Sequence, residues 1–358
     1  MASTFRAIIL RCDGKEQSLT GLIDQFGRTA TDLRMSLIDK CNLRCQYCMP
    51  AEGLDWLKKD DMLTAHEVIR LADIGISQLG IDEIRFTGGE PLVRADLVDI
   101  LDGVHSKHPD VDLSMTTNGI NLERKVDDLV AAGLSRINVS LDTVCPETFA
   151  KITRRDRLTK VLSGLHSAKA AGLGPIKINA VLLRGINDTQ AAELLTWSLA
   201  HGYKLRFIEQ MPLDADQSWK RANMVTAAEI REQISQTYTL TPHEAPRGSA
   251  PAELFNVADP ATGEVLGTVG IIASVTEPFC AECTRTRLTA DAKVRSCLFS
   301  HTETDLMELL RDGSSDEAIA DAWREAMWHK PKAHGQTKTG LGMPGFVQPE
   351  RSMSAIGG

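Results

Sequence analysis

An alternation of strand-like and helical segments runs from about residue 30 to residue 212 and limits the folds open to this chain. Six segments are predicted to form strands, namely residues 32–38, 83–87, 112–117, 136–142, 177–183 and 205–211. Helical periodicity fills the intervals, and one helix is expected to begin at Thr64, with Glu67 completing a capping box, and to stop at Gly80. Six βα units in series predict a parallel sheet with helices outside.

The predicted strands have one polar and one apolar phase. The polar phase contains Arg34, Ser36, Arg85, Thr87, Ser114, Thr116, Asn138, Ser140, Asp142, Lys177 and Asn179. A doubly wound sheet, buried on both faces, would be apolar in both phases. We therefore expect an α/β fold, an incomplete (βα)6 TIM-like barrel whose polar phase lines the interior and whose site lies at the carboxyl ends of the strands. The sixth strand fits less well because Ile208 interrupts its polar phase, and an open α/β sheet with a few buried polar residues is the alternative.

The βα rhythm stops after Met211, which divides the chain into residues 1–212 and residues 213–358. In the second part a strand-rich stretch begins at Glu264. A hairpin is predicted from residues 285–289 and 293–298, and two helices from residues 305–311 and 316–329. The Gly- and Pro-rich end predicts a mobile tail that finishes in Gly357 and Gly358.

Composition excludes several classes of protein. The formal charge of −8 disfavours binding to a nucleic-acid polymer or an anionic membrane, and no run of about 18 apolar residues suits a bilayer. The first ten residues lack the features of a secretory signal. Eight cysteines in such a chain indicate the reducing cytoplasm, where clustered thiols are more often metal ligands than disulfides.

Six of the eight cysteines form two separated triads. The first consists of Cys41, Cys45 and Cys48, and the second of Cys280, Cys283 and Cys297. Three thiolates leave one coordination position open, which is typical of a reactive metal centre rather than a sealed structural one. Two iron–sulfur clusters, each with one free iron, are therefore expected. Cys12 and Cys145 belong to no motif and are predicted to be ordinary buried thiols.

The first triad resembles the cluster motif of the radical S-adenosylmethionine (SAM) superfamily. It follows the first predicted strand, and Thr87-Gly-Gly-Glu-Pro91 after the second resembles the turn that grips the amino group of SAM in that superfamily. The resemblance implies a [4Fe–4S] cluster that binds SAM at its fourth iron. It also implies a set of residues that contact SAM, namely Tyr47, Gly89, Ser140 and Met211. A zinc site completed by a distant ligand is the alternative for this triad.

The second triad resembles the auxiliary-cluster motif of the GTP 3′,8-cyclase family, which begins molybdenum cofactor biosynthesis. The resemblance extends from about Arg34 to Cys297 and includes the terminal glycines. It implies a C-terminal extension with a second [4Fe–4S] cluster whose open iron binds the guanine of GTP. It further implies that Gly357 and Gly358 reach into the active site.

Basic side chains are expected to bind the triphosphate. Arg285 and Arg287 point the same way in a strand, and isolated cations within a barrel would be costly without an anionic ligand. By resemblance the GTP-binding residues are Arg34, Arg85, Thr116, Lys177, Arg285, Thr286 and Arg287. The alternative is that these cations pair with internal carboxylates such as Asp142.

The resemblance implies a lyase that converts GTP into (8S)-3′,8-cyclo-7,8-dihydroguanosine 5′-triphosphate by a SAM-derived radical. No residue is assigned as a catalytic acid or base. The partners implied are a reductant such as flavodoxin or ferredoxin, a second copy in a possible homodimer, and the cyclic pyranopterin monophosphate synthase that receives the product. The alternatives are a peptide-modifying radical SAM maturase with an auxiliary cluster and a non-catalytic iron–sulfur electron carrier.

Overall fold

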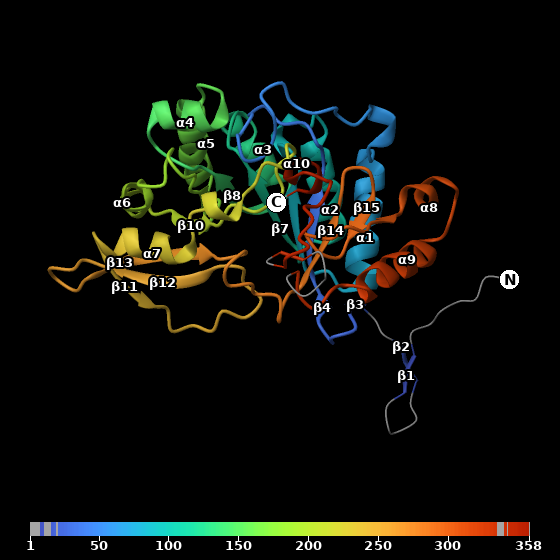
Figure 1. Ribbon diagram of the computed structural model, residues 1–358. Coiled ribbons are helices and arrows are strands. Elements are labelled where there is room, and N and C mark those ends of the chain that lie inside the picture. The colour runs from blue at the N-terminus through green and yellow to red at the C-terminus, as the bar shows by residue number, and fades with distance from the viewer. Residues whose placement is uncertain (1–7, 11–15, 19–20, 335–339, 342, 358) are drawn as a thin grey trace.

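A twelve-stranded sheet forms the centre of the molecule in the computed structural model, which describes residues 8–10, 16–18, 21–334, 340–341 and 343–357 (Figure 1). Its strands, from one edge to the other, are β11 (Thr239–Pro242), β12 (Glu253–Ala258), β13 (Val265–Ile272), β10 (Lys204–Ile208), β9 (Lys177–Val181), β8 (Leu134–Ser140), β7 (Asp112–Thr117), β6 (Glu83–Thr87), β5 (Asp32–Ser36), β14 (Arg285–Leu288), β15 (Lys293–Arg295) and β16 (Thr304–Asp305). Two small antiparallel sheets pair β1 (Ile8–Leu10) with β2 (Glu16–Ser18), and β3 (Leu22–Ile23) with β4 (Thr29–Ala30).

The six strands from β5 to β10 are parallel and adjacent in chain order, which confirms the predicted α/β class. The register places Arg34 opposite Arg85, and Arg85 opposite Ser114, so the polar phases of neighbouring strands lie on the same face. Among the described strands no pairing joins the two edges, so the sheet stays open, as an incomplete barrel requires.

Helices lie outside the sheet, except the short α10 (Met353–Ile356), which belongs to the C-terminal tail. They are α1 (Ala65–Leu79), α2 (Leu97–Lys107), α3 (Val126–Ala131), α4 (Pro146–Thr153), α5 (Leu158–Ala170), α6 (Ala191–His201), α7 (Ala227–Ser235), α8 (Met307–Arg311), α9 (Asp316–Trp328) and α10 (Met353–Ile356), with 3-10 turns η1 (Lys59–Asp61), η2 (Pro91–Val93), η3 (Leu122–Arg124) and η4 (Arg221–Asn223). The capping box of Thr64 and Glu67 and the left-handed Gly80 at the end of α1 are confirmed. None of the helices in the described ranges is long and apolar enough to cross a membrane.

The apolar phase of the strands forms the core against these helices. Leu33, Ile84 and Phe86 are fully buried and belong to one cluster with Val68 and Leu71 of α1. Since successive side chains of a strand point to opposite faces, the polar phase is directed away from the helices, into the interior of the curved sheet.

Strands from the second part of the chain extend this sheet at both edges. β13 pairs in parallel with β10, and β14 pairs in parallel with β5. The predicted hairpin is confirmed as β14 and β15, in which Arg287 lies opposite Arg295. The two predicted helices are confirmed as α8 and α9, although α8 begins at Met307 rather than at Asp305.

Helix α9 fixes β14 from the outer side. Trp323 is fully buried, and its indole Nε1 donates a hydrogen bond of 3.0 Å to Oγ1 of Thr286. Thr286 was expected to contact GTP, but its side chain points towards α9 while its neighbours Arg285 and Arg287 point the other way. This placement favours a contribution of Thr286 through its position between the two arginines rather than through its hydroxyl group.

Replacing Trp323 with Phe should lower the free energy of unfolding by about 1–3 kcal/mol, because it leaves the buried Thr286 hydroxyl without its donor. Trp323→Ala should cost about 3–5 kcal/mol because it also opens a cavity. Urea denaturation followed by circular dichroism measures both changes. Trp328→Phe on the same helix is the matched control, since Trp328 is only half-buried. Equal stability of Trp323→Phe and the control would contradict this role.

Candidate active site

The first cysteine triad lies on the loop that follows β5. Local hydrogen bonds shape this loop, from the Cys48 amide to Cys45 O at 2.9 Å and from Arg44 Nη1 to Cys41 O at 2.7 Å. Cys41, Cys45 and Cys48 are free and partly buried. They lie close enough together that the charge of one thiolate affects the ionisation of its neighbours. Burial raises the pKa of Cys41 to about 11 and that of Cys48 to about 12. A bound metal centre would therefore have to stabilise the thiolates, and three such ligands fit a [4Fe–4S] cluster with one open iron.

The Gly88-Gly89-Glu90 turn holds this loop through its backbone. The Gly89 amide donates to Ile38 O at 2.6 Å, and the Glu90 amide donates to Lys40 O at 2.8 Å. A Cβ atom on Gly89 would lie 2.3 Å from the carbonyl oxygens of Asp39 and Lys40. The glycines were expected to admit the amino group of SAM, and the structure gives them the further task of allowing two backbones to touch.

Glu90 is a buried carboxylate that sequence reasoning did not single out. It accepts hydrogen bonds from Thr117 Oγ1 and from the Asn118 amide, both at 2.6 Å. Burial raises the pKa of Glu90 to about 7. Asn118 Nδ2 in turn lies 3.8 Å from Cys41 Sγ. Glu90 thus ties the end of β7 to the cysteine loop, and the Gly-Gly-Glu motif was the signal that could have revealed it.

The residues expected to contact SAM surround the same region. Tyr47 donates from its hydroxyl to Asp142 Oδ2 at 2.9 Å and lines a cavity of about 390 Å³. Burial raises the pKa of Asp142 to about 6, and its Oδ1 accepts from the Val181 amide. Ser140 ends β8 and Met211 follows β10, each half-buried at the carboxyl ends of the strands. Asp142, the carboxylate expected as a partner for the basic residues, therefore accepts a hydrogen bond from Tyr47 instead.

Two of the interior arginines do have carboxylate partners. Arg34 makes a bidentate ion pair with Asp32, at 2.8 and 2.7 Å, and Arg85 pairs with Glu83. Arg85 also donates to Ser114 Oγ at 3.1 Å. The alternative of internal pairing thus holds for these two, with carboxylates from their own strands.

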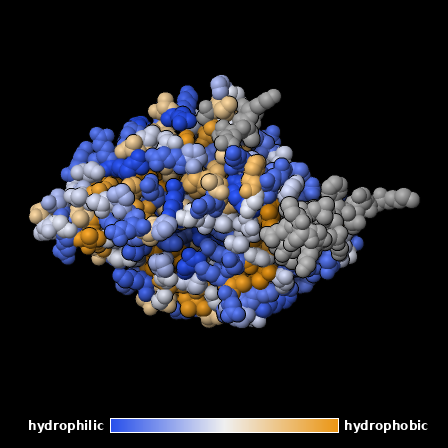
Figure 2. Space-filling model, turned by 90° about the horizontal axis from the view of Figure 1, so that it is seen from below, coloured by the Kyte–Doolittle hydropathy of each residue, from blue (hydrophilic) through white to orange (hydrophobic). Residues whose placement is uncertain are grey.

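Lys177, Arg206 and Arg287 have no carboxylate within ion-pairing distance in the described part of the chain; Arg206 and Arg287 are buried, and Lys177 is half-buried. Burial lowers the pKa of Lys177 to about 8 and those of Arg206 and Arg287 to about 9, and neighbouring cations add to each shift. Arg206, which donates to Asn179 Oδ1 at 2.9 Å, was missed because Ile208 obscured the polar phase of its strand. Such an excess of buried positive charge favours an anionic ligand. The face turned towards the viewer in Figure 2 is hollowed near its centre, where hydrophilic residues gather.

The second cysteine triad lies at the start of β14 and after β15. The Cys283 amide donates to Cys280 O at 3.3 Å, and the imidazole Nδ1 of His334 lies 3.3 Å from Cys280 Sγ. Arg285 is directed towards this triad, since its Nη2 donates to Cys283 Sγ at 3.2 Å. No three His, Cys, Asp or Glu side chains in the described ranges are arranged to hold a single metal ion. The donors near Cys280, Cys283 and Cys297 are three thiols, which fit a second cluster.

The described part of the tail enters the polar interior. The carbonyl oxygen of Gly357 accepts a hydrogen bond of 2.9 Å from Arg287 Nη1. Gly357 has a φ of 82°, and a Cβ atom there would lie 2.5 Å from Thr87 Cγ2 and 3.2 Å from Ser36 Cβ. Only glycine suits this position. Gly358 lies outside the described residues.

The two remaining cysteines, Cys12 and Cys145, belong to neither triad. Cys12 lies outside the described residues. Cys145 was predicted to be a buried thiol, but it is only partly buried, and its thiol donates to Glu147 Oε2 at 3.2 Å. The prediction failed because Cys145 directly precedes α4, at a partly exposed corner.

Comparison with known proteins agrees with this geometry. The family model of the radical SAM superfamily matches residues 35–198, and that of Molybdenum Cofactor Synthesis C matches residues 203–336. The fold and the site thus define a radical SAM protein. The chain is 59% identical to a GTP 3′,8-cyclase of Paenarthrobacter nicotinovorans, covering 94% of this chain and 97% of that protein. It is 53% identical to a GTP 3′,8-cyclase of Streptomyces coelicolor, over 98% and 100% of the two chains. The chain therefore belongs to the GTP 3′,8-cyclase family.

Solved structures share the fold at low identity. SuiB of Streptococcus suis bound to its precursor peptide SuiA superposes with a TM-score of 0.56 at 13% identity, over 86% of this chain and 66% of SuiB. SuiB bound to S-adenosylmethionine gives 0.54 at 14% identity, over 84% and 65%. The chain thus spans about two thirds of the length of SuiB, and the likeness concerns the fold alone.

Replacing Gly89 with Ala should weaken the first cluster, because the new Cβ would push against the backbone of the cysteine loop. Iron and sulfide counting after anaerobic reconstitution should show a loss of iron from the first triad, with the second retained. Gly75→Ala is the control, since its Cβ meets nothing closer than Ile81 Cγ1 at 3.4 Å. Full iron content and SAM cleavage in Gly89→Ala would show that the close contact is not needed.

Proposed function

We propose that this chain is a GTP 3′,8-cyclase, a radical SAM lyase that converts GTP into (8S)-3′,8-cyclo-7,8-dihydroguanosine 5′-triphosphate in molybdenum cofactor biosynthesis. The observation that carries the proposal is a set of cations without a carboxylate partner, the buried Arg206 and Arg287 and the half-buried Lys177, in a polar interior flanked by two cysteine triads. Membership of the family supports the same reaction.

Cys41, Cys45 and Cys48 would hold the [4Fe–4S] cluster that the radical SAM superfamily uses together with SAM. When bound, this pair supplies the radical that removes the hydrogen atom from ribose C3′ of GTP. The Gly88-Gly89 turn would bind the amino group of SAM, and Ser140 its carboxylate or ribose. Tyr47, held by Asp142, and Met211 would contact the adenine.

The basic interior would bind the triphosphate. Arg34 and Arg85 keep a carboxylate partner, so they are oriented before the substrate arrives. Lys177, Arg206 and Arg287 lack one and would gain most from a phosphate oxygen. Arg287 also donates to Gly357, so it can hold the tail and the substrate in the same place.

A second [4Fe–4S] cluster on Cys280, Cys283 and Cys297 would bind the guanine. Arg285 would stand between the two parts of the substrate, since its guanidinium donates to Cys283. Thr116, whose Oγ1 lies 3.5 Å from Asn138 Nδ2, would lie beside the sugar or the base. The residues bind, orient and shield GTP, and none of them is assigned a proton transfer.

The remaining partners complete the proposal. A low-potential reductant such as flavodoxin or ferredoxin would supply the electron, in the cytoplasm. The proposed assembly is a homodimer, and the cyclised product would pass to the cyclic pyranopterin monophosphate synthase. The peptide maturase and the electron carrier receive less support, because neither needs unpaired cations deep in a polar interior.

The reconstituted protein, given SAM, dithionite and GTP under anaerobic conditions, should form the cyclised triphosphate and 5′-deoxyadenosine. Cys283→Ala should stop cyclisation while reductive cleavage of SAM continues at the first triad. Mass spectrometry of the nucleotides measures both, with Cys145→Ala as the control for loss of an unrelated thiol. SAM cleavage that never consumes GTP would reject the proposal.

The affinity for GTP should fall as the pH rises above about 8, the pKa to which burial lowers Lys177. The protonated amine binds the anion, and the bound anion shifts the lowered pKa of Lys177 back towards its ordinary value. Affinity should therefore be constant below pH 8 and then fall by up to about tenfold per pH unit. Equilibrium binding between pH 7 and 9 tests this, and Lys177→Arg should remove the slope because its charge persists. An unchanged slope in Lys177→Arg, with exposed Lys204→Met as the control, would assign it to another group.

A further inference from the structure

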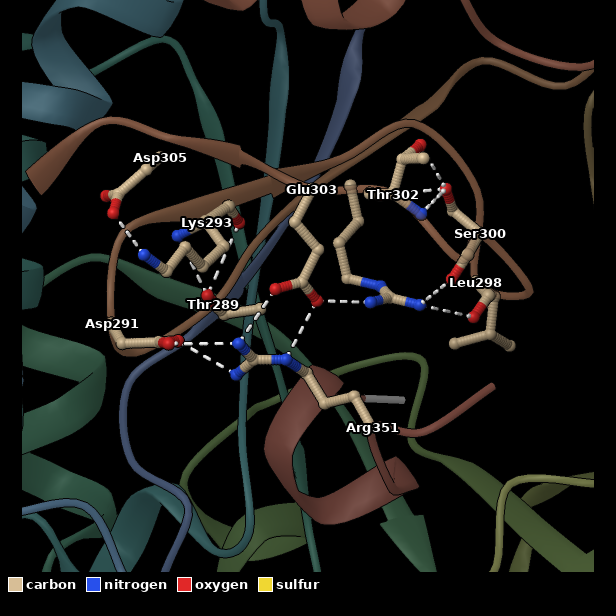
Figure 3. Close-up of polar contacts among 10 residues, drawn as sticks. Thr289, Asp291, Lys293, Leu298, Ser300, Thr302, Glu303, Asp305 and Arg351 are labelled. Carbon is tan, nitrogen blue, oxygen red and sulfur yellow. Dashed lines mark hydrogen bonds and ion pairs between the residues drawn. The ribbon is translucent and has the colours of Figure 1, made fainter. Parts of the chain in front are cut away.

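We propose that Arg351 is a positioning residue, which holds the C-terminal segment so that Gly357 stays in the active site. The inference deepens the proposed function and rests on it. It starts from an ion-pair cluster outside the substrate-binding residues, made by Arg351, Asp291, Glu303 and Arg295, which we call the tail clamp (Figure 3).

Arg351 is held at both ends of its guanidinium group. Its Nη1 and Nη2 donate to the two carboxylate oxygens of Asp291 at 2.9 and 3.0 Å. Its Nη2 and Nε lie 2.8 Å from the two oxygens of Glu303. All three side chains are at most 21% exposed, so solvent screens these contacts less than those of a surface pair. A planar fork between two carboxylates fixes position as well as charge.

The carboxylates of the tail clamp are themselves fixed. Glu303 also pairs with Arg295, whose side chain is 3% exposed and which donates to Ser300 O and to Leu298 O. Arg295 therefore braces the loop that carries Cys297, and this bracing does not involve Arg351. Asp291 stands in the turn between β14 and β15. The tail clamp thus rests on the hairpin that also provides Arg287.

The segment between the tail clamp and the active site is short. Ser352 precedes the single turn α10, whose first residue, Met353, donates its amide to Leu213 O at 2.9 Å. One residue past α10, Gly357 meets Arg287. The two ends of this seven-residue stretch are therefore attached to one hairpin, Arg351 to its turn and Gly357 to its first strand.

This arrangement makes Arg351 the charged anchor of the stretch. Without it, the stretch would keep only uncharged anchors such as the hydrogen bond from the Met353 amide to Leu213 O, together with the bond from Arg287 to Gly357 O, whose donor the substrate also needs. A displacement of the tail by even about 1 Å can lower a reaction rate roughly 100-fold when the geometry of the reacting groups matters. Arg351 would act through the tail and would not touch GTP or SAM.

The test compares four anaerobically reconstituted proteins: the parent chain, Arg351→Ala, the chain lacking Gly357 and Gly358, and the combination of both changes. We expect Arg351→Ala to keep its iron content and SAM cleavage, to lose cyclisation roughly 10- to 100-fold, and to show faster amide hydrogen exchange at residues 353–357. The combined variant should be no slower than the truncated chain, because both changes act on the same segment. Arg311→Ala, which breaks a comparable ion pair with Glu67 on the outer surface, should match the parent.

Other results would overturn the proposal. Parental exchange and cyclisation in Arg351→Ala would show that the tail does not depend on the tail clamp. A further loss in the combined variant, or a loss of iron, would assign Arg351 another role. Asp291→Asn is a second variant that leaves the pair of Arg295 and Glu303 in place, and it should reproduce the effect if Arg351→Ala does not fold. If the parent itself forms no product, the proposed function fails, while hydrogen exchange still tests the tail clamp.

Discussion

The parallel pairing of β14 with β5 is the interaction on which the site depends. It sets Arg285 opposite Asp32 and Arg287 opposite Arg34, so a strand from the second part of the chain continues the sheet begun by the first. The second cysteine triad flanks this strand, and the first follows β5. One ladder of backbone hydrogen bonds therefore fixes the distance between two cysteine triads about 240 residues apart in sequence.

The polar interior carries an excess of positive charge. Asp32 and Glu83 neutralise the arginines of β5 and β6, but Lys177, Arg206 and Arg287 stay uncompensated. Folding must bear the cost of burying them, and a bound polyanion would recover it. The lowered pKa of Lys177 reflects the same cost, because burial and the neighbouring cations both destabilise its protonated form. These three cations thus lower the stability of the ligand-free protein and raise its affinity for an anion.

Local signals were read correctly from the sequence, whereas the side-chain contacts of particular residues with distant segments were often missed. The capping box at Thr64 and the alternation of Arg34 and Ser36 depend on neighbouring residues, so the helix and the polar face could be predicted. By contrast, the side chain of Thr286 turns to α9 because Trp323 lies there, which no spacing reveals. Arg206 was lost because one apolar residue, Ile208, masked the period of its strand. The motifs located both triads, but only the fold shows that the tail reaches Arg287.

The position of Gly357 has a practical consequence for the preparation of this protein. Its neighbours Thr87, Ser36 and Gly88 leave no room for a side chain, and the chain beyond it starts from the polar interior. A purification tag fused after Gly358 would have to leave through this polar interior, or pull the last turn out of place. A tag at the amino end would avoid this conflict, and the same protein could then differ in activity according to which end was tagged.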